Sequence, residues 1–408
     1  MMESTANDRG IAQAAKLPRR DWILLPMLSL LTVCLLAGST ELIARRMFAY
    51  APTSVYNCIV MGGPSTGYRA IPNSVCWGKS AEGSPVEYRF NSCGHRAGME
   101  CGPKPQGSYR IVMAGSSVAM GDLVQRDQTL AALLPSELTK RTGRKIDVYN
   151  EGMMQESAAT IALRFKELIA AKPDMILWIL TPWDVQHASF ILPPAPKVPE
   201  KRVFLGATRQ HVEQALATKS VPEAVHGILE TMHDLLQASS SKLMLQHFLF
   251  ESQSLYLRSA LGTGDSAEFL KDQSSAERQD RLRDFDLSYA EIEAQAAAAG
   301  QPLVVMLVPD RVQAAMLSRG EWPSGFDPYK LDNELRAIVQ SHGGTYIDIL
   351  PEFRGIPNAE RYYLPFDGHP NAGGHRIVAG LLAKALTDGA VPELSVPAQP
   401  QVAQARAR

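Results

Sequence analysis

After residue 108, short apolar runs alternate with amphipathic stretches along most of the chain. Apolar runs that end at turn residues predict buried strands, whereas apolar positions repeating every three or four residues predict helices. The predicted strands are Arg110–Ala114, Lys145–Tyr149, Met175–Leu180, Leu303–Val308 and Thr345–Ile349. The predicted helices are Gln128–Thr142 (with Asp127 as its N-cap), Ser157–Ala171, Ser288–Ala299, Asp332–Ser341 and Ala372–Leu386. This alternation indicates a three-layer α/β/α fold with a central parallel sheet.

Two regions depart from this rhythm. Residues 46–108 are rich in Gly, Pro, Ser and Asn and show no helical period, so we expect an irregular lead-in. Residues 188–280 start with four closely spaced prolines, which predict a stiff connector at Pro193, Pro194, Pro196 and Pro199. Helical patterns follow at His211–Ala217, Val221–Leu236 and Lys242–Leu261. We interpret residues 188–280 as a helical insertion that covers a site or offers a surface to a partner.

A long uncharged stretch lies near the N-terminus. Trp22–Gly38 carries no charge, and with the residues up to Ala44, which include Glu41, it approaches the roughly 20 residues that cross a bilayer. Four cations precede it, namely Arg9, Lys16, Arg19 and Arg20. That bias favours a cytoplasmic N-terminus and an exported body, although Arg45 and Arg46 reduce it. We expect a single-pass inner-membrane anchor over residues 22–45; the alternative is a cleaved signal peptide, for which no clean Ala-x-Ala site is present.

Length and composition limit the kind of protein and the number of domains. A chain of 408 residues accommodates one large domain with additions, and its 45% apolar and 20% charged residues are ordinary for a globular protein. The net charge of -1 argues against nucleic acid as a partner. We therefore expect a cytoplasmic tail (1–21), an anchor (22–45), a lead-in (46–108), an α/β domain (109–389, including the 188–280 insertion) and a disordered Pro/Ala/Gln-rich tail (390–408).

Cysteine positions support export. Cys58, Cys76, Cys93 and Cys101 cluster in the lead-in, and the fifth cysteine, Cys34, lies in the apolar stretch. Four clustered cysteines outside a membrane indicate two disulfides formed in an oxidising compartment, with three pairings open. Zinc is the alternative, but the chain has no Cys-x-x-Cys pair, so we expect no metal site.

Two short motifs carry candidate chemistry. Gly-Ser-Ser-Val-Ala-Met-Gly (115–121) follows the first predicted strand, and Asp367-Gly368-His369 precedes the last predicted helix. A serine hydroxyl becomes nucleophilic when a base removes its proton, and the base needs a carboxylate to fix its tautomer. Ser117 is therefore the candidate nucleophile, His369 the base and Asp367 the acid. A turn or N-cap serine and a surface histidine are the simpler readings of each motif alone.

The predicted strand ends bring further candidates to one place. Ser117, Gly152 and Thr181–Asp184 follow three successive strands, and ligands of parallel sheets bind outside the carboxyl ends of the strands. The backbone N–H groups of Ser117 and Gly152 are candidate donors to an oxyanion. His375 is a rival histidine that is better explained as part of the last helix. Asp348 is a reserve carboxylate, more simply read as a cap at a strand end.

The motifs resemble those of the SGNH/GDSL hydrolases, in their esterase and O-acyltransferase branches. Residues 115–121 resemble the first conserved block, Tyr149–Gly152 the second, and Asp367–His375 the last. Tyr88–Arg96 is similar to the segment that precedes the first block in membrane-anchored members. Over residues 88–388 the resemblance implies a flavodoxin-like α/β/α fold, Ser117 as nucleophile, Asp367 and His369 as acid and base, and Gly152 as an oxyanion donor.

The chain departs from this family at three points. Ser116 stands where an aspartate is usual, and Thr181-Pro182-Trp183-Asp184 replaces Gly-x-Asn-Asp, so Trp183 occupies the place of an oxyanion-donating asparagine. The Trp183 indole N–H is then a substitute donor. The acid and base are spaced Asp-x-His instead of Asp-x-x-His, which resembles periplasmic polysaccharide O-acetyltransferases.

The expected function is that of a membrane-anchored serine esterase without a cofactor, facing the periplasm. Its expected substrates are O-acyl esters, foremost O-acetyl, of cell-envelope glycans, cleaved through an acyl-serine intermediate. A polysaccharide O-acyltransferase with the same triad is one alternative. A non-catalytic glycan-binding or scaffold protein on an inactivated fold is the other. The expected partners are an acylated glycan or small ester and the lipid bilayer; no protein partner is indicated.

Overall fold

A computed structural model of the chain describes Pro18 and residues 20–48, 55–61, 67–96, 100–189, 239–263 and 265–395. The predicted proline connector, the predicted helices His211–Ala217 and Val221–Leu236, most of the cytoplasmic tail and the end of the C-terminal tail lie outside these residues. The account below concerns the described residues alone.

A five-stranded parallel sheet forms the centre of the molecule. Its strands are β5 (Ser108–Gly115), β6 (Lys145–Asn150), β7 (Met175–Leu180), β8 (Leu303–Leu307) and β9 (Thr345–Ile347), in the order β6-β5-β7-β8-β9. Every residue of β5, β7 and β8 is buried, as continuous apolar runs require in a sheet covered on both faces. The five strands predicted from the sequence are confirmed.

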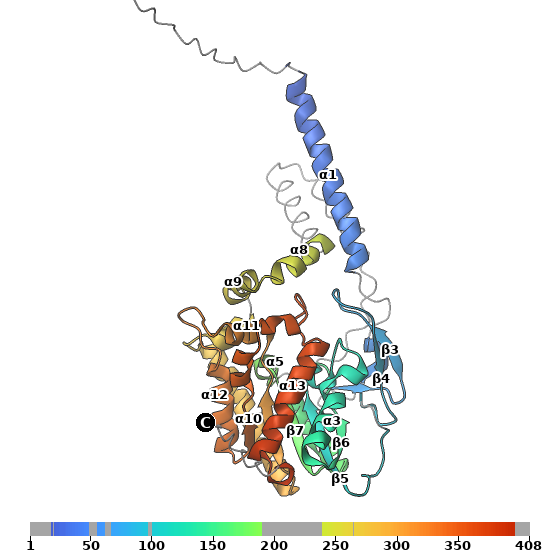
Figure 1. Cartoon of the computed structure of the whole chain (residues 1–408), viewed down its shortest axis with the longest axis vertical. Helices are drawn as coiled ribbons and strands as arrows, with labels where there is room; N and C mark the ends of the chain where they lie inside the picture. Colours follow the sequence, from blue (N-terminus) through green and yellow to red (C-terminus); the bar gives the residue numbers. More distant parts are fainter. Residues whose placement is uncertain are drawn as a thin grey trace, which may run out of the picture.

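Two pairs of helices cover the sheet. Helix α3 (Leu130–Thr142) packs against α13 (Ala372–Ala385), and α4 (Ala158–Ala170) packs against α10 (Ala276–Ala298). Figure 1 shows α3 and α13 side by side over the strands. The chain moves from β5 outward to β6 and then back across β5 to β7, so right-handed crossovers place α3 and α4 on opposite faces. The predicted three-layer α/β/α fold is confirmed.

Several helix boundaries differ from the prediction. Thr129 caps α3 by accepting from Ala132 N–H, whereas the expected cap, Asp127, lies in a 3₁₀ turn. The expected helix Lys242–Leu261 is two helices, α8 (Ser240–Phe250) and α9 (Gln253–Thr263). Helix α10 starts at Ala276 and so crosses the expected end of the insertion at residue 280.

Among the remaining helical elements, α12 (Lys330–Ser341) confirms the predicted helix Asp332–Ser341, and the others are short or were not predicted. They are α2 (Ser117–Met120), α5 (Pro182–Gln186), α11 (Arg311–Arg319), 3₁₀ helices at Val55–Cys58, Arg126–Gln128, Asp265–Leu270, Leu350–Gly355, Ala359–Tyr362 and Pro392–Leu394, and a π-helical turn at Leu386–Ala390.

The lead-in has more regular structure than the sequence indicates. Two antiparallel pairs, β1 (Ile59–Met61) with β2 (Tyr68–Ala70) and β3 (Val75–Gly78) with β4 (Val86–Arg89), replace the irregular segment we expected. Disulfides join Cys58 to Cys76 and Cys93 to Cys101, which resolves the open pairing. The apolar side chains of these strands form their own cluster, which reaches the α/β domain through Met120, Met153 and Met154.

Helix α1 (Asp21–Met47) projects from the rest of the molecule (Figure 1). By length and composition it is apolar enough to cross a membrane, and its most apolar window has no residue buried inside the protein. A signal sequence near an N-terminus has the same properties. At its base, Ala44 is buried, and the following Phe48 is buried as well.

Candidate active site

Ser117 is held at the carboxyl end of β5, which lies between β6 and β7 in the sheet. The chain turns at Gly115, where φ is 136° and a Cβ atom would lie 2.3 Å from the carbonyl oxygen of Ile179. Only glycine fits there, because it combines a positive φ with close approach of a neighbouring strand. The turn starts α2 at Ser117 and directs its hydroxyl toward the rim of the sheet, where ligands of parallel sheets bind.

His369 and Asp367 reach Ser117 from a loop before α13. His369 Nε2 lies 2.8 Å from Ser117 Oγ, and His369 Nδ1 lies 2.6 Å from Asp367 Oδ1. An ionised carboxylate only accepts, so Nδ1–H donates to Asp367 and Nε2 is left to accept from the Ser117 hydroxyl. The structure thus joins the three residues in one hydrogen-bonded row, although 252 positions separate Ser117 from His369.

Charges around His369 favour its protonated form. Partial burial lowers the pKa of His369, but the hydrogen bond and the negative charge of Asp367, together with the charge of Asp122, outweigh it and leave the pKa above the ordinary value of histidine. For Asp367 the directions are reversed. Burial raises its pKa, but the hydrogen bond and the charge of His369 outweigh burial and leave the pKa below the ordinary value of aspartate. Asp367 therefore carries the charge that stabilises an imidazolium at His369.

A cavity of about 550 Å³ opens at Ser117. Its walls come from the segments that follow β5, β6, β7 and β8, from α9, and from the loop that holds His369. Among the residues named from the sequence, Ser117, Trp183, Asp367 and His369 line it. Ser117 and the segment Thr181–Trp183 thus meet at one cavity as predicted, whereas Gly152 does not line it.

Two of the three candidate oxyanion donors lie at this cavity. The Ser117 N–H belongs to the first position of α2, where a helix supplies no acceptor. The Trp183 ring also lines the cavity and stacks on His187 with centroids 4.3 Å apart. Its role as a donor stays a prediction.

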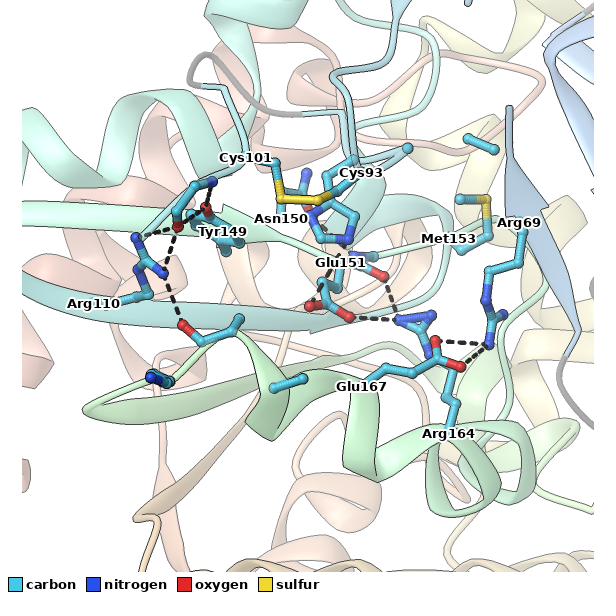
Figure 2. A pocket seen from close by; sticks show the side chains of 18 of the residues that line it. Arg69, Cys93, Cys101, Arg110, Tyr149, Asn150, Glu151, Met153, Arg164 and Glu167 are labelled. Atoms are coloured by element: carbon cyan, nitrogen blue, oxygen red, sulfur yellow. Dashed lines mark hydrogen bonds and ion pairs between the residues drawn. A yellow bond between two sulfur atoms is a disulfide. The ribbon is translucent and has the colours of Figure 1, made fainter. Parts of the chain in front are cut away.

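Gly152, the third candidate, occupies a different place. Its N–H donates to Asn150 Oδ1 (3.0 Å), and a Cβ atom there would lie 2.7 Å from the Ala119 Cβ. Gly152 lines a second cavity of about 720 Å³ beside the edge strand β6 and the Cys93–Cys101 disulfide (Figure 2). Close packing against α2 explains this glycine, and the structure does not support the expected oxyanion role.

The second cavity is larger than the cavity at Ser117 but lacks a nucleophile–base pair. Its buried arginines are paired with carboxylates: Arg164 with Glu151 and Glu156, and Arg110 with Asp147. Figure 2 shows the Arg164–Glu151 pair inside this cavity and the Arg69–Glu167 pair at its side. We therefore place the candidate active site at the smaller cavity.

Ser116 stands where the SGNH/GDSL hydrolases usually have an aspartate, and its side chain points away from His369. Its hydroxyl donates to Asp184 Oδ2 (3.1 Å), which also accepts from the N–H and hydroxyl of Thr181. Burial raises the pKa of Asp184 to about 7 despite these hydrogen bonds. The two adjacent serines thus differ: Ser116 holds the β5 and β7 turns together, and Ser117 faces His369.

The two reserve residues lie away from the triad contacts. Asp348 pairs with Arg336 and accepts from Leu350 N–H (3.0 Å), as the strand-end reading predicted. His375 is buried in α13, where its Nδ1 accepts from Leu130 N–H (3.1 Å), and burial lowers its pKa to about 3. Neither has a contact with Ser117.

Sequence reasoning missed two carboxylates that support the triad. Glu82, from the lead-in, accepts from the N–H groups of Phe366 (2.8 Å) and Asp367 (3.0 Å) and is 4% exposed. No signal marks it, because its partners lie 284 and 285 positions later. Asp122 lines the cavity and accepts from the Tyr88 hydroxyl; its position directly after the first motif was the available signal.

The described residues contain no group of three or more His, Cys, Asp or Glu side chains placed to hold a metal ion. The arrangement at Ser117 consists of a hydroxyl, an imidazole and a carboxylate in a row beside backbone N–H groups. Such a row can transfer the hydroxyl proton to His369 while Ser117 attacks a carbonyl carbon.

No family model and no curated protein sequence matches this chain. Similar solved structures include LAE5, an alpha/beta hydrolase enzyme from the metagenome of Lake Arreo, Spain (13% identity, 68% of this chain and 94% of that chain, TM-score 0.37). A second is the lipase/acylhydrolase from Enterococcus faecalis (13% identity, 68% of this chain and 95% of that chain, TM-score 0.36). A third is a variant of Axe2, an acetyl xylan esterase from Geobacillus stearothermophilus (12% identity, 71% of this chain and 96% of that chain, TM-score 0.35). With TM-scores below 0.5, these similarities alone assign neither activity nor substrate. The similar solved structures also include a putative lipolytic protein of the G-D-S-L family from Desulfitobacterium hafniense (9% identity, TM-score 0.30) and a putative GDSL-like lipase from Parabacteroides merdae (10% identity, TM-score 0.34).

Proposed function

We propose that this chain is a serine esterase in which Ser117 attacks an ester carbonyl. The observation that carries the proposal is the row Ser117–His369–Asp367, with distances of 2.8 and 2.6 Å. His369 takes the hydroxyl proton, and Asp367 stabilises the resulting imidazolium. The Ser117 N–H, with the Trp183 indole as a candidate second donor, stabilises the tetrahedral oxyanion.

The reaction then proceeds by two transfers. Collapse of the tetrahedral adduct releases the alcohol, which takes its proton from His369, and leaves the acyl group on Ser117 Oγ. Water, activated by His369, attacks the acyl-serine and restores the enzyme. A sugar hydroxyl in place of that water would make the chain a polysaccharide O-acyltransferase, the alternative favoured by the Asp-x-His spacing.

We further propose that α1 remains as an anchor in the inner membrane and that the catalytic domain is exported. The apolar span, the cations before it and the two disulfides support this placement. The proposed substrate is an O-acyl, foremost O-acetyl, ester of an envelope glycan. Such an ester is reached from the side of the membrane on which disulfides persist.

Fluorophosphonate labelling of the full-length, detergent-solubilised protein tests the nucleophile. The reagent should phosphonylate the wild type and the Ser116→Ala variant, because Ser116 faces Asp184 and not His369. Ser117→Ala should abolish labelling. No labelling of folded wild-type protein would overturn the esterase and acyltransferase proposals and favour a glycan-binding or scaffold protein.

A product assay distinguishes hydrolysis from transfer. Full-length protein is incubated with 4-nitrophenyl acetate and a deacetylated polysaccharide, and both free acetate and polysaccharide-bound acetyl groups are measured. Acetate alone supports the esterase; new acetyl esters that disappear in Ser117→Ala would show that the chain is a transferase.

A further inference from the structure

Helix α8 exposes a row of large apolar side chains. Leu245, Phe248 and Leu249 are 59, 53 and 42% exposed and lie at positions i, i+3 and i+4, so they share one face of the helix. No residue of α8 is buried. A helix that leaves such a row in contact with water indicates an interaction surface.

The position of α8 relative to α1 suggests what covers this row. Glu41 of α1 accepts from the Ser239 hydroxyl (2.6 Å) and from the N–H groups of Ser240 (3.2 Å) and Ser241 (3.0 Å), at the start of α8. Glu41 follows Asp21 by about 30 Å of helix, which equals the hydrocarbon thickness of a bilayer. Glu41 therefore fixes the start of α8 at the level where α1 would leave the membrane, and Figure 1 shows α8 extending from the base of α1 toward α9.

The other contacts of α8 lead to the active site. A ring nitrogen of His247 donates to Glu82 (2.7 Å), the carboxylate that also binds the Asp367 loop. The carbonyl of Phe250, at the end of α8, accepts from Arg311. In α9, Tyr256 and Ala260 line the Ser117 cavity. Helix α8, followed by α9, thus connects the membrane end of α1 to the wall of the cavity.

We propose that α8 lies in the outer surface of the bilayer, with Leu245, Phe248 and Leu249 among the acyl chains, so that the Ser117 cavity receives an ester presented by the membrane. Lys242, Arg45 and Arg46 are exposed at this level, with Arg45 also paired to Glu41, and their positive charges match the phosphates of the lipid headgroups. This inference rests on the proposed anchor and nucleophile and adds the route of the substrate: an amphiphilic ester enters along the lipid surface.

A depth measurement on the full chain tests the position of α8. The thiol of Cys34, in α1, is free and exposed, so an NBD fluorophore on it reports on the anchor. In a Cys34→Ser background, Leu249→Cys reports on α8, and Leu287→Cys, at an exposed leucine of α10, is the matched control. Each protein is placed in vesicles of phosphatidylethanolamine and phosphatidylglycerol that contain brominated lipid.

We expect brominated lipid to reduce the emission at positions 34 and 249 about twofold and to leave position 287 unchanged. Quenching at 34 but not at 249 would overturn the inference and show that something other than lipid covers the row. An unquenched label at 34 would overturn the anchor and this inference with it.

Two acetyl esters test the route of the substrate. Full-length protein in the same vesicles receives either soluble 4-nitrophenyl acetate or bilayer-held 1,2-dioleoyl-3-acetylglycerol, and released acetate is measured. The double variant Leu245→Gln, Phe248→Gln should lose about tenfold on the bilayer-held ester and nothing on the soluble ester, whereas Leu287→Gln should match the wild type on both. Equal rates for the double variant and the wild type, or wild-type cleavage of the soluble ester alone, would overturn the inference. A wild type that cleaves neither ester would overturn the proposed esterase.

Discussion

At the scale of single residues, the pair Asp367–His369 governs how activity depends on pH. His369 accepts a proton only when neutral, and Asp367 raises its pKa. The wild-type rate should therefore rise with pH through a value above the ordinary pKa of histidine. In Asp367→Asn the loss of the charge should move this rise to lower pH and reduce kcat/KM about a thousandfold or more.

The pH profile of kcat/KM for 4-nitrophenyl acetate checks this prediction. Asp348→Asn is the matched control, because Asp348 is also a loop aspartate but pairs with Arg336. Its profile should coincide with that of the wild type. A profile that moves in Asp348→Asn and not in Asp367→Asn would contradict the proposed acid.

The residues proposed as the triad could be named from the sequence, whereas the residues that position them could not. Ser117, Asp367 and His369 stand in short motifs whose residue types suit one reaction. Gly152 stood in a motif as well, but its N–H is used by Asn150, a contact that spacing does not reveal. Glu82 acts through the loop 366–367, and only the folded chain brings these segments together.

At the scale of elements, Glu82 joins the lead-in, α8 and the loop that carries the acid. Glu82→Gln replaces one accepting oxygen with an amide donor, so a partly buried N–H of the Phe366–Asp367 segment would lose its charged acceptor. The loss should cost about 2 kcal/mol of unfolding free energy and lower kcat about tenfold. Urea unfolding and steady-state kinetics measure the two effects.

Glu87→Gln is the control for this prediction, because Glu87 lies in the same lead-in and pairs with Arg89 at the surface. It should change neither quantity measurably. A Glu82→Gln enzyme with wild-type kcat would show that the loop is positioned by its other contacts.

The disulfide between Cys58 and Cys76 links two small strand pairs that are too short to be stable alone. Removing it with Cys58→Ala and Cys76→Ala frees a loop with a sequence separation of 18 and should lower the unfolding free energy by about 3 kcal/mol. The Cys34→Ser variant, which keeps both disulfides, should retain wild-type stability. Equal denaturation midpoints for all three proteins would contradict a stabilising role.

At the scale of the molecule, the sheet was predictable because its strands are continuous apolar runs. The strands of the lead-in have three or four residues, too few to show a pattern. The missed helix α11 buries Arg311 and Gln313 together with its apolar residues, so it has no polar face to mark its period. The start of α10 at Ala276 was missed for the opposite reason. The first half of this helix is rich in charged residues and has no apolar stripe that would predict a helix.

The whole chain also allows a direct test of the anchor. A peptide tag before Met1 should remain on the mature, membrane-bound protein, and the protein should resist extraction at alkaline pH, because the apolar span of α1 stays in the bilayer. A cleaved signal peptide would remove the tag and release the body in soluble form. Immunoblots of the membrane and soluble fractions with tag and C-terminal antibodies distinguish the two results.

The distance of 252 positions between Ser117 and His369 has a consequence for the order of synthesis. The nucleophile emerges from the ribosome before its base, which follows 252 residues later. If the body is exported during synthesis, the hydroxyl acquires its base only after the 252 residues that follow Ser117 have also crossed the membrane. Esters on the side of synthesis would then never meet an assembled enzyme, and the order of the motifs would itself confine the reaction to one compartment.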